Sequence, residues 1–288
     1  MERLRKAGRI SGYQMRMALG NKRMRMIILI LLLFVVQTLL PVRSFCGDIH
    51  VAAAPVAFVF LVNDYICQFL IIAGAVMLFS DAPFENEGYL YMLPRAGRIS
   101  WGLGQIFYIF RIAFLYVGCL MAATILPLVG YLSIQEGWGK IWGTLAKTDA
   151  ALVYGLEFSV PEMIVSRYTP VEALTVSFLL ELACIIWIGL FVYAGNKISR
   201  KPLGTVAGVF FTLLDICISN DWLEDAYACS PVSLAQLTTY SGYASKYHID
   251  LRYGVCFFII GIAVLSGLCI ILNKSERKGK WILWKQKR

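Results

Sequence analysis

Four ionisable side chains lie inside otherwise apolar stretches of the sequence, namely Asp64, Arg111, Glu181 and Asp215. A charge in hydrocarbon is costly, so such residues usually face a partner or a water-filled cavity. Counting 1.5 Å per residue places the three acids about 5–15 Å below one membrane surface and Arg111 near the other. The acids therefore either line an outer vestibule on a translocation path for cationic or amphipathic cargo, or are hydrogen-bonded structural residues.

Motifs for self-contained chemistry are missing from the sequence. There is no GxxxxGK[ST] to hold ATP phosphates, no HExxH and no GxSxG. The eight cysteines contain no CxxC pair, and Cys46 and Cys229 fall in predicted outer loops, where they either pair or remain free thiols. We therefore expect no catalytic residue, no metal site and no cofactor in this chain, and no enzyme activity of its own.

The composition indicates a chain that folds in a lipid bilayer rather than in water. The 288 residues are 59% hydrophobic and only 16% charged, whereas a soluble domain carries about 25% charged residues. Hydrocarbon about 30 Å thick needs about 17–25 helical residues, and six runs are long enough: 26–42, 56–79, 105–130, 173–195, 203–219 and 253–272. A backbone N–H or C=O group without a hydrogen-bond partner costs too much free energy in lipid, so each run must be helical. The sequence therefore predicts an all-α polytopic membrane protein with six transmembrane helices.

The basic residues set the orientation of these spans. Of the 27 Lys and Arg residues, 20 fall in 1–25, 80–104, 196–202 and 273–288, and six fall in 43–55, 131–172 and 220–252. Cytoplasmic loops carry the excess of basic residues, so both termini are predicted to be cytoplasmic. This placement accounts for the net charge of +9 without a nucleic-acid partner.

Three segments outside the spans have a readable pattern. The basic segment 1–25 is either a topology anchor on anionic lipid or an interfacial elbow helix. In the outer segment 131–172, Trp138, Ile141, Trp142 and Leu145 share one helix face, which predicts an amphipathic helix on the outer interface. A third segment, 230–242, is a short helix candidate that could dip into the membrane, with Ser230 as its cap.

The loop 80–104 contains a further predicted helix, residues 81–93. Asp81 can cap it, Pro83 suits its first turn, Glu85 and Glu87 favour its positive end, and Pro94 stops it. Phe84 and Tyr91 lie seven residues apart and would share one face of this helix. A short helix that presents aromatic residues to the cytoplasm is either a docking element or a turn that rests on the membrane.

The sequence resembles a large family of bacterial ABC-transporter permeases of the exporter type (ABC-2-like). Six pieces carry the resemblance, in order along most of the chain: Asp81-Ala-Pro-Phe84, Arg95-x-x-Arg98-x-x-Trp101, Gly104-Gln-Ile-Phe-Tyr108, Trp138-Gly-Lys140 with Thr144-Leu-Ala-Lys147-Thr148, Asn196 with Gly204, and Ser230-Pro-Val-Ser233. The family implies a multi-pass subunit of the plasma membrane that works with a separate cytosolic ABC ATPase. ATP and magnesium would bind that ATPase, and a second permease copy or a homologous permease would complete the path.

The resemblance also implies roles for particular residues. The ATPase-docking residues would be Asp81, Pro83, Phe84, Glu85, Glu87, Tyr91, Arg95 and Arg98. Gly204 and Gly208 form a small-xxx-small pair that lets helices approach closely, either within the subunit or at a dimer seam. Exporter permeases of this type use the fifth span at their seam.

Two other functional classes remain open. One is an ATP-independent secondary transporter, which often shows an inverted repeat with broken midplane helices. The other is a membrane sensor or immunity protein that binds peptides outside the cell. A P-loop ATPase in the neighbouring reading frame would favour the permease over both.

The predicted topology can be tested with reporter fusions. Because of the basic-residue bias, fusions at Lys201 and Gln286 should report cytoplasm, and fusions at Lys147 and Lys246 should report the outside. A cytoplasmic signal from Lys147 would overturn the orientation assigned to the second half of the chain.

Overall fold

A computed structural model describes residues 1–85, 88–134, 137–240 and 249–286, with the side chains of Glu224 and 275–286 outside the description. The described residues form helices and no β-strand, and an isolated bridge joins Ala53 to Leu132. The all-α prediction is confirmed for this part of the chain.

Four of the described helices are long and apolar enough to cross a membrane: α2 (Lys22–Asp48), α6 (Arg98–Ile125, continued by η1, Leu126–Leu128), α10 (Pro170–Ser199) and the first part of α12 (Leu251–Gln286). Two shorter apolar helices accompany them, α4 (Tyr65–Phe79) and α11 (Leu203–Ser219). At 1.5 Å per residue, α4 is about 22 Å long and α11 about 25 Å, less than a hydrocarbon core of about 30 Å. The four long apolar helices are consistent with a membrane protein, and the count of six spans stays a prediction.

The expected second span, 56–79, is broken in the middle. Helix α3 (Ala57–Val62) ends at Asn63, and α4 begins after Asp64, whose carboxylate accepts hydrogen bonds from the backbone N–H groups of Ile66 and Cys67, each at 3.1 Å. The prediction of one continuous helix is wrong here because the Asp64 side chain caps a new helix, which an Asp does readily.

Other boundaries also move relative to the sequence expectation. The first and third helices begin earlier, at Lys22 and Arg98, and α12 continues into the predicted tail 273–288 as far as Gln286. The N-terminal segment forms a helix of its own, α1 (Glu2–Gly20), which packs on α6 as an elbow in front of α2.

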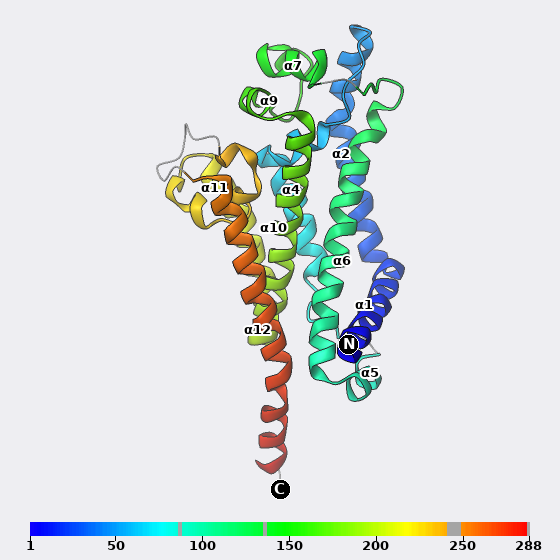
Figure 1. The fold of residues 1–288 in the computed structure, drawn as a ribbon, viewed down its shortest axis with the longest axis vertical. Coiled ribbons are helices and arrows are strands. Elements are labelled where there is room, and N and C mark those ends of the chain that lie inside the picture. Colours follow the sequence, from blue (N-terminus) through cyan, green and yellow to red (C-terminus); the bar gives the residue numbers. More distant parts are fainter. Residues whose placement is uncertain (86–87, 135–136, 241–248, 287–288) are drawn as a thin grey trace.

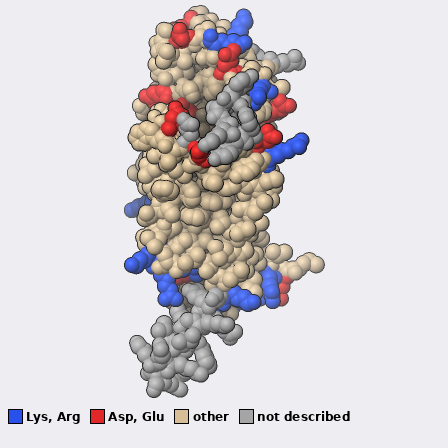
Figure 2. Space-filling view, turned by 90° about the vertical axis from the view of Figure 1, so that its left-hand side faces the viewer, with Lys and Arg blue, Asp and Glu red and all other residues tan. Residues whose placement is uncertain are grey.

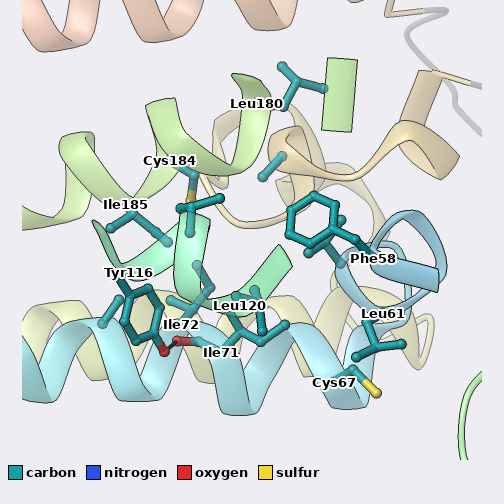
Figure 3. Close-up of a cluster of buried hydrophobic side chains, with 14 of the residues drawn as sticks. Phe58, Leu61, Cys67, Ile71, Ile72, Tyr116, Leu120, Leu180, Cys184 and Ile185 are labelled. Carbon is teal, nitrogen blue, oxygen red and sulfur yellow. Dashed lines mark hydrogen bonds between the residues drawn. The ribbon is translucent and has the colours of Figure 1, made fainter. Parts of the chain in front are cut away.

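Helix α10 is the central helix of the bundle. Of its most apolar stretch 61% is buried, against 11% for α12. It contacts α4, α6, α11 and α12, and Figure 1 shows it between α12 on one side and α6 on the other. Part of the core lies where α4, α6 and α10 meet: Ile71, Ile72, Tyr116, Leu120 and Ile185 point toward one another in Figure 3. The Tyr116 hydroxyl donates to the Ile71 carbonyl at 2.7 Å, so its polar end is satisfied inside the core.

The two ends of the bundle differ in charge. The end that carries α5 (Tyr89–Ala96), the start of α1 and the end of α12 is called the basic end below, and the end that carries α7 (Gly139–Lys147) and α9 (Glu162–Arg167) is called the opposite end (Figure 1). On the face seen in Figure 2, a wide belt with few charges separates a lower end dominated by Lys and Arg from an upper end where both signs mix. That distribution fits a bilayer around the belt.

The amphipathic helix of the outer segment exists as α7, but its apolar face is not at the membrane interface. Ile141 and Trp142 are fully buried, and Trp138 and Trp142 pack against the ring of Phe60. The Trp138 indole donates to the Tyr168 carbonyl and the Trp142 indole to the Ala54 carbonyl, each at 2.9 Å. The interfacial placement predicted for these tryptophans is therefore wrong, because α3 provides the apolar surface that they cover.

The glycine pair of α11 packs within the chain. A Cβ on Gly204 would lie 2.5 Å from the Val192 carbonyl oxygen, and one on Gly208 would touch Val76 and Val192 at 3.1–3.3 Å. Both glycines are buried against α10 and α4. Of the two interpretations of this motif, the contacts support packing within the subunit, and the dimer seam stays a prediction.

This packing predicts a specific stability loss. Gly204→Ala forces a methyl group into the α10 backbone, and overpacking of this kind costs about 1–3 kcal/mol. Gly267→Ala in α12 is the matched control, because a Cβ there meets nothing within 4 Å. Thermal unfolding of the two purified variants in detergent should show a lower midpoint for Gly204→Ala alone. Equal midpoints would contradict the close contact of α10 and α11.

Candidate functional site

A cluster of buried polar side chains lies around the break between α3 and α4. Its members come from the break itself, from α4, α10 and α11 and from the segment that follows α11, and each is at most 6% exposed: Asn63, Asp64, Gln68, Ser177, Glu181, Asp215, Ser233 and Gln236. We call this set the polar cluster. From the basic end of α4 at Phe79, Asp64 lies about 22 Å along the helix, well into the far half of a membrane.

Asn63 connects three elements of the polar cluster. Its amide nitrogen donates to the Val59 carbonyl at 2.7 Å and to the Ser177 hydroxyl at 3.2 Å, and its oxygen accepts from the Leu237 N–H. The helix break is thereby joined to α10 and to η4 (Leu237–Tyr240). A buried amide with these bonds is satisfied, so it fixes its surroundings rather than offering a free group.

Both carboxylate oxygens of Asp64 also accept hydrogen bonds from within the protein. Besides capping α4, its second oxygen accepts from the Ser159 N–H at 3.1 Å and from the Ser159 hydroxyl at 3.3 Å. The carboxylate therefore holds the start of α4 against the segment between α8 (Ala150–Val153) and α9.

Glu181 and Asp215 belong to the same region and lie within electrostatic range of each other. Asp215 accepts from the Ser233 hydroxyl at 2.6 Å and from the Gln236 amide at 3.0 Å. Glu181 accepts from the Gln68 amide at 2.7 Å, while Oε1 of Glu181 and Oε1 of Gln68 are buried with no hydrogen-bond partner in the protein. These two acceptor oxygens are the part of the polar cluster able to receive a further donor.

The three predicted acids thus do not line an open vestibule. Asp64, Glu181 and Asp215 are 4%, 0% and 1% exposed, and each has a hydrogen-bonded partner from another element. The structure favours the hydrogen-bonded interpretation over the open vestibule. Within the described residues, no group of three or more His, Cys, Asp or Glu side chains is arranged to hold a metal ion.

The segment after Ser230 is not the short α-helix that was expected. It forms two 3₁₀ turns, η3 (Ser233–Ala235) and η4, and its side chains from Val232 to Leu237 are buried; residues 241–242 of the predicted helix lie outside the described residues. Irregular backbone at membrane depth is tolerated only where protein surrounds it. The polar cluster supplies that environment.

The loop at the basic end differs from its prediction as well. The helix expected over 81–93 is wrong: residues 81–85 are not helical, and the helix is α5, which contains Pro94 instead of stopping before it. Phe84 adopts a positive φ of 43°, and Glu87 lies outside the described residues.

The base of this loop is fastened to three helices. Arg23 of α2 forms an ion pair with Asp81 and donates to the Met77 carbonyl at 2.6 Å. On the other side, Lys197 of α10 pairs with Glu85 at 3.0 Å. The Asn196 amide donates to the Ala82 carbonyl at 3.0 Å. Residues 81–85 therefore move with α2, α4 and α10.

Phe84 and Tyr91 do not share a surface. Phe84 is 8% exposed and packs on the rings of Tyr108 and Tyr193, at centroid distances of 4.8 and 6.4 Å. Leu90 and Tyr91 of α5 are instead 75% and 77% exposed at the basic end. The shared aromatic face was predicted from helical spacing, and it fails because the helix starts only at Tyr89.

The remaining predicted docking residues are spread around the same loop. Arg95 is exposed on α5, Pro83 is half-buried, and Arg98 begins α6 with one guanidinium nitrogen buried. Beside the loop, a cavity of about 470 Å³ lies between α1, α2 and α4, with Gln14, Arg23, Asp81 and Phe84 in its wall.

No protein-family model and no curated protein matches this sequence.

The polar cluster predicts a difference between two chemically identical substitutions, one within α11 and one just after it. Asp215→Asn replaces an acceptor of two hydrogen bonds by an amide whose nitrogen faces a donor, which costs about 1–3 kcal/mol. Asp221→Asn, two residues after the end of α11, changes an exposed residue and should be neutral. Thermal unfolding should separate the variants, and amide exchange in peptides covering 230–240 should rise only for Asp215→Asn. Equal exchange in both variants would show that Asp215 does not hold this segment.

Proposed function

We propose that the chain is the membrane-spanning permease subunit of an ABC exporter, in which a separate cytosolic ATPase drives movement of a substrate across the plasma membrane. The observation that carries the proposal is the loop at the basic end. Its tip exposes Leu90 and Tyr91 on a short helix, and its base is fastened to three membrane helices. An ATPase can do work on the membrane helices only through such a contact.

Helices α4 and α10 can transmit that work. At the basic end both helices hold the loop: the Ala82 N–H donates to the Phe79 carbonyl of α4 at 2.9 Å, and Lys197 of α10 pairs with Glu85. Further along, the same two helices carry Gln68 and Glu181 of the polar cluster. A displacement of α5 that tilts α4 against α10 therefore separates groups that are now hydrogen-bonded, about 20 Å away.

The polar cluster is then a closed part of the translocation path. Its free acceptor oxygens on Gln68 and Glu181 suit cargo that carries a cation or several N–H or O–H donors. Water and cargo reach them only after the helices separate, which fits a path that opens in response to ATP.

The proposed topology keeps six spans, with α3 and α4 together as the second and both termini in the cytoplasm. The basic end faces the cytoplasm in this arrangement, as the excess of Lys and Arg at that end favours. A second permease copy would meet the exposed face of α11, where Val206, Phe210 and Leu213 are 48–62% exposed.

One observation favours an alternative, an ATP-independent secondary transporter. Such transporters bind substrate at discontinuous helices, and the break between α3 and α4 is a discontinuity of that kind. They usually carry a related break in the other half of the fold. In the described part of the second half, α10 and the apolar stretch of α12 run without interruption.

The docking proposal is tested with Leu90→Ala combined with Tyr91→Ala. Both side chains are exposed, so their removal should leave the fold intact, whereas a contact made by an aromatic anchor loses about 2 kcal/mol or more, roughly thirtyfold in affinity. The measurement is the amount of partner ATPase that co-purifies with the variant relative to the wild type.

The matched control is Leu152→Ala with Val153→Ala, two side chains that are 79% and 80% exposed at the opposite end. This pair should retain as much ATPase as the wild type. If all three proteins retained equal amounts of ATPase, Leu90 and Tyr91 of α5 would not form the ATPase contact. If neither the wild type nor the control retained an ATPase, the secondary transporter and the sensor would become the better proposals.

A further inference from the structure

A groove lies on the face of α6 that points away from the helix bundle, and it is separate from the polar cluster and from the loop at the basic end. It measures about 550 Å³, and its wall is made by Met15 of α1 and by one face of α6 that includes Phe110, Arg111, Phe114, Gly118 and Ala122. Phe110 and Phe114 are 39% and 60% exposed. The groove therefore opens away from the bundle, toward the side where lipid surrounds a membrane helix.

Arg111 is the one charged side chain in the wall of this groove. It is exposed, and its hydrogen bond to the Gly8 carbonyl is long, at 3.5 Å. None of the ion pairs found among the described residues includes it. A guanidinium on a lipid-facing surface is costly unless an anion reaches it, and this position therefore calls for a negatively charged partner from the membrane.

Helix α1 adds positive charge beside Arg111. Arg5, Arg9 and Arg16 are exposed, and helical spacing places them with Gly12 along one side of α1. Gly12 itself faces the guanidinium, since a Cβ there would lie 3.8 Å from Nη1 of Arg111. Gly8 and Gly12 have no side chain to cover the Arg111 guanidinium. Helix α1 therefore leaves this group open while its arginines add positive charge nearby.

The length of the groove suits one acyl chain. From Phe110 to Ala122 the helix advances about 18 Å, slightly more than one leaflet of a hydrocarbon core about 30 Å thick. Arg111 lies toward the basic end of that stretch, and α1 packs at the same level. A headgroup at Arg111 would therefore send its acyl chain past Phe114 and Gly118 toward Ala122.

We propose that this groove is a binding site for an anionic glycerophospholipid. The lipid phosphate pairs with the Arg111 guanidinium beside the basic side of α1, and one acyl chain lies along α6. Guanidinium and phosphate suit each other because two parallel N–H groups can bind two phosphate oxygens. The site bridges α1 and α6, so a bound lipid stabilises the elbow helix, whether or not the chain works with an ATPase.

Native mass spectrometry of the delipidated full-length protein in detergent tests the proposal. The probes are phosphatidylglycerol and phosphatidylcholine with the same acyl chains, each titrated against the wild type and variants. Both lipids carry the phosphate, but in phosphatidylcholine the choline cation offsets its negative charge. The wild type should therefore bind one phosphatidylglycerol more tightly than phosphatidylcholine, by about tenfold. Arg111→Gln should remove that preference, and Gly118→Phe should weaken binding of both lipids at this site.

Two matched controls separate the groove from general effects. Arg252→Gln removes an exposed arginine elsewhere, and Gly267→Phe adds the same aromatic group to α12, where a Cβ meets nothing within 4 Å. Both should bind phosphatidylglycerol like the wild type. Gly118 also has nothing within 4 Å of a Cβ, so Gly118→Phe should keep the wild-type unfolding midpoint without lipid.

Three results would overturn the proposal. Equal binding of the two lipids by the wild type would show ordinary boundary lipid. Unchanged phosphatidylglycerol binding by Arg111→Gln or by Gly118→Phe would place the bound lipid elsewhere. A wild-type dimer that Gly118→Phe dissociates would show that the groove is covered by a second copy of the chain.

Discussion

Polar groups carried into hydrocarbon must find their partners inside the protein, and this constraint organises the half of the molecule toward the opposite end. The chain breaks the apolar stretch 57–79 at Asn63 and Asp64 and follows α11 with irregular turns, so backbone groups lose their helical partners among apolar elements. Asn63 accepts from the Leu237 N–H, and Asp64 accepts from the N–H groups of Ile66 and Cys67. Asp215 holds the turns through the side chains of Ser233 and Gln236. Helix α7 then closes this region with two buried tryptophans.

The same helices that meet this constraint also reach the basic end. Helices α4 and α10 carry the polar cluster at one level and fasten the loop 81–85 at the other. The polar bonds are directional, so a small change in the relative tilt of α4 and α10 breaks them, whereas apolar contacts would adjust gradually. In the proposed permease, this property links an ATPase contact at α5 to a path that is closed at rest.

Much of the architecture could be predicted from the sequence. Hydropathy indicated the membrane class, and helical spacing located α7. The sequence was misleading where a side chain competes with the backbone or where a distant element supplies a surface. For Asp64 the sequence leaves open a vestibule charge or a hydrogen-bonded residue and does not indicate that it caps a helix. The pattern also places Phe84 on a helix that in fact starts only at Tyr89. Asn63 and Gln68 were overlooked, although amides inside an apolar run are themselves a signal of a buried network.

The central claim is that the chain is one half of an ATP-driven assembly, and the most direct measurement is the composition of that assembly. The wild-type chain is isolated from its own membrane in mild detergent, and quantitative mass spectrometry determines which proteins accompany it and in what ratio. The account predicts a cytosolic protein with a P-loop, present in near-equal molar amount. A chain that is isolated without any ATPase, and that moves solute along an ion gradient when reconstituted alone, would contradict it.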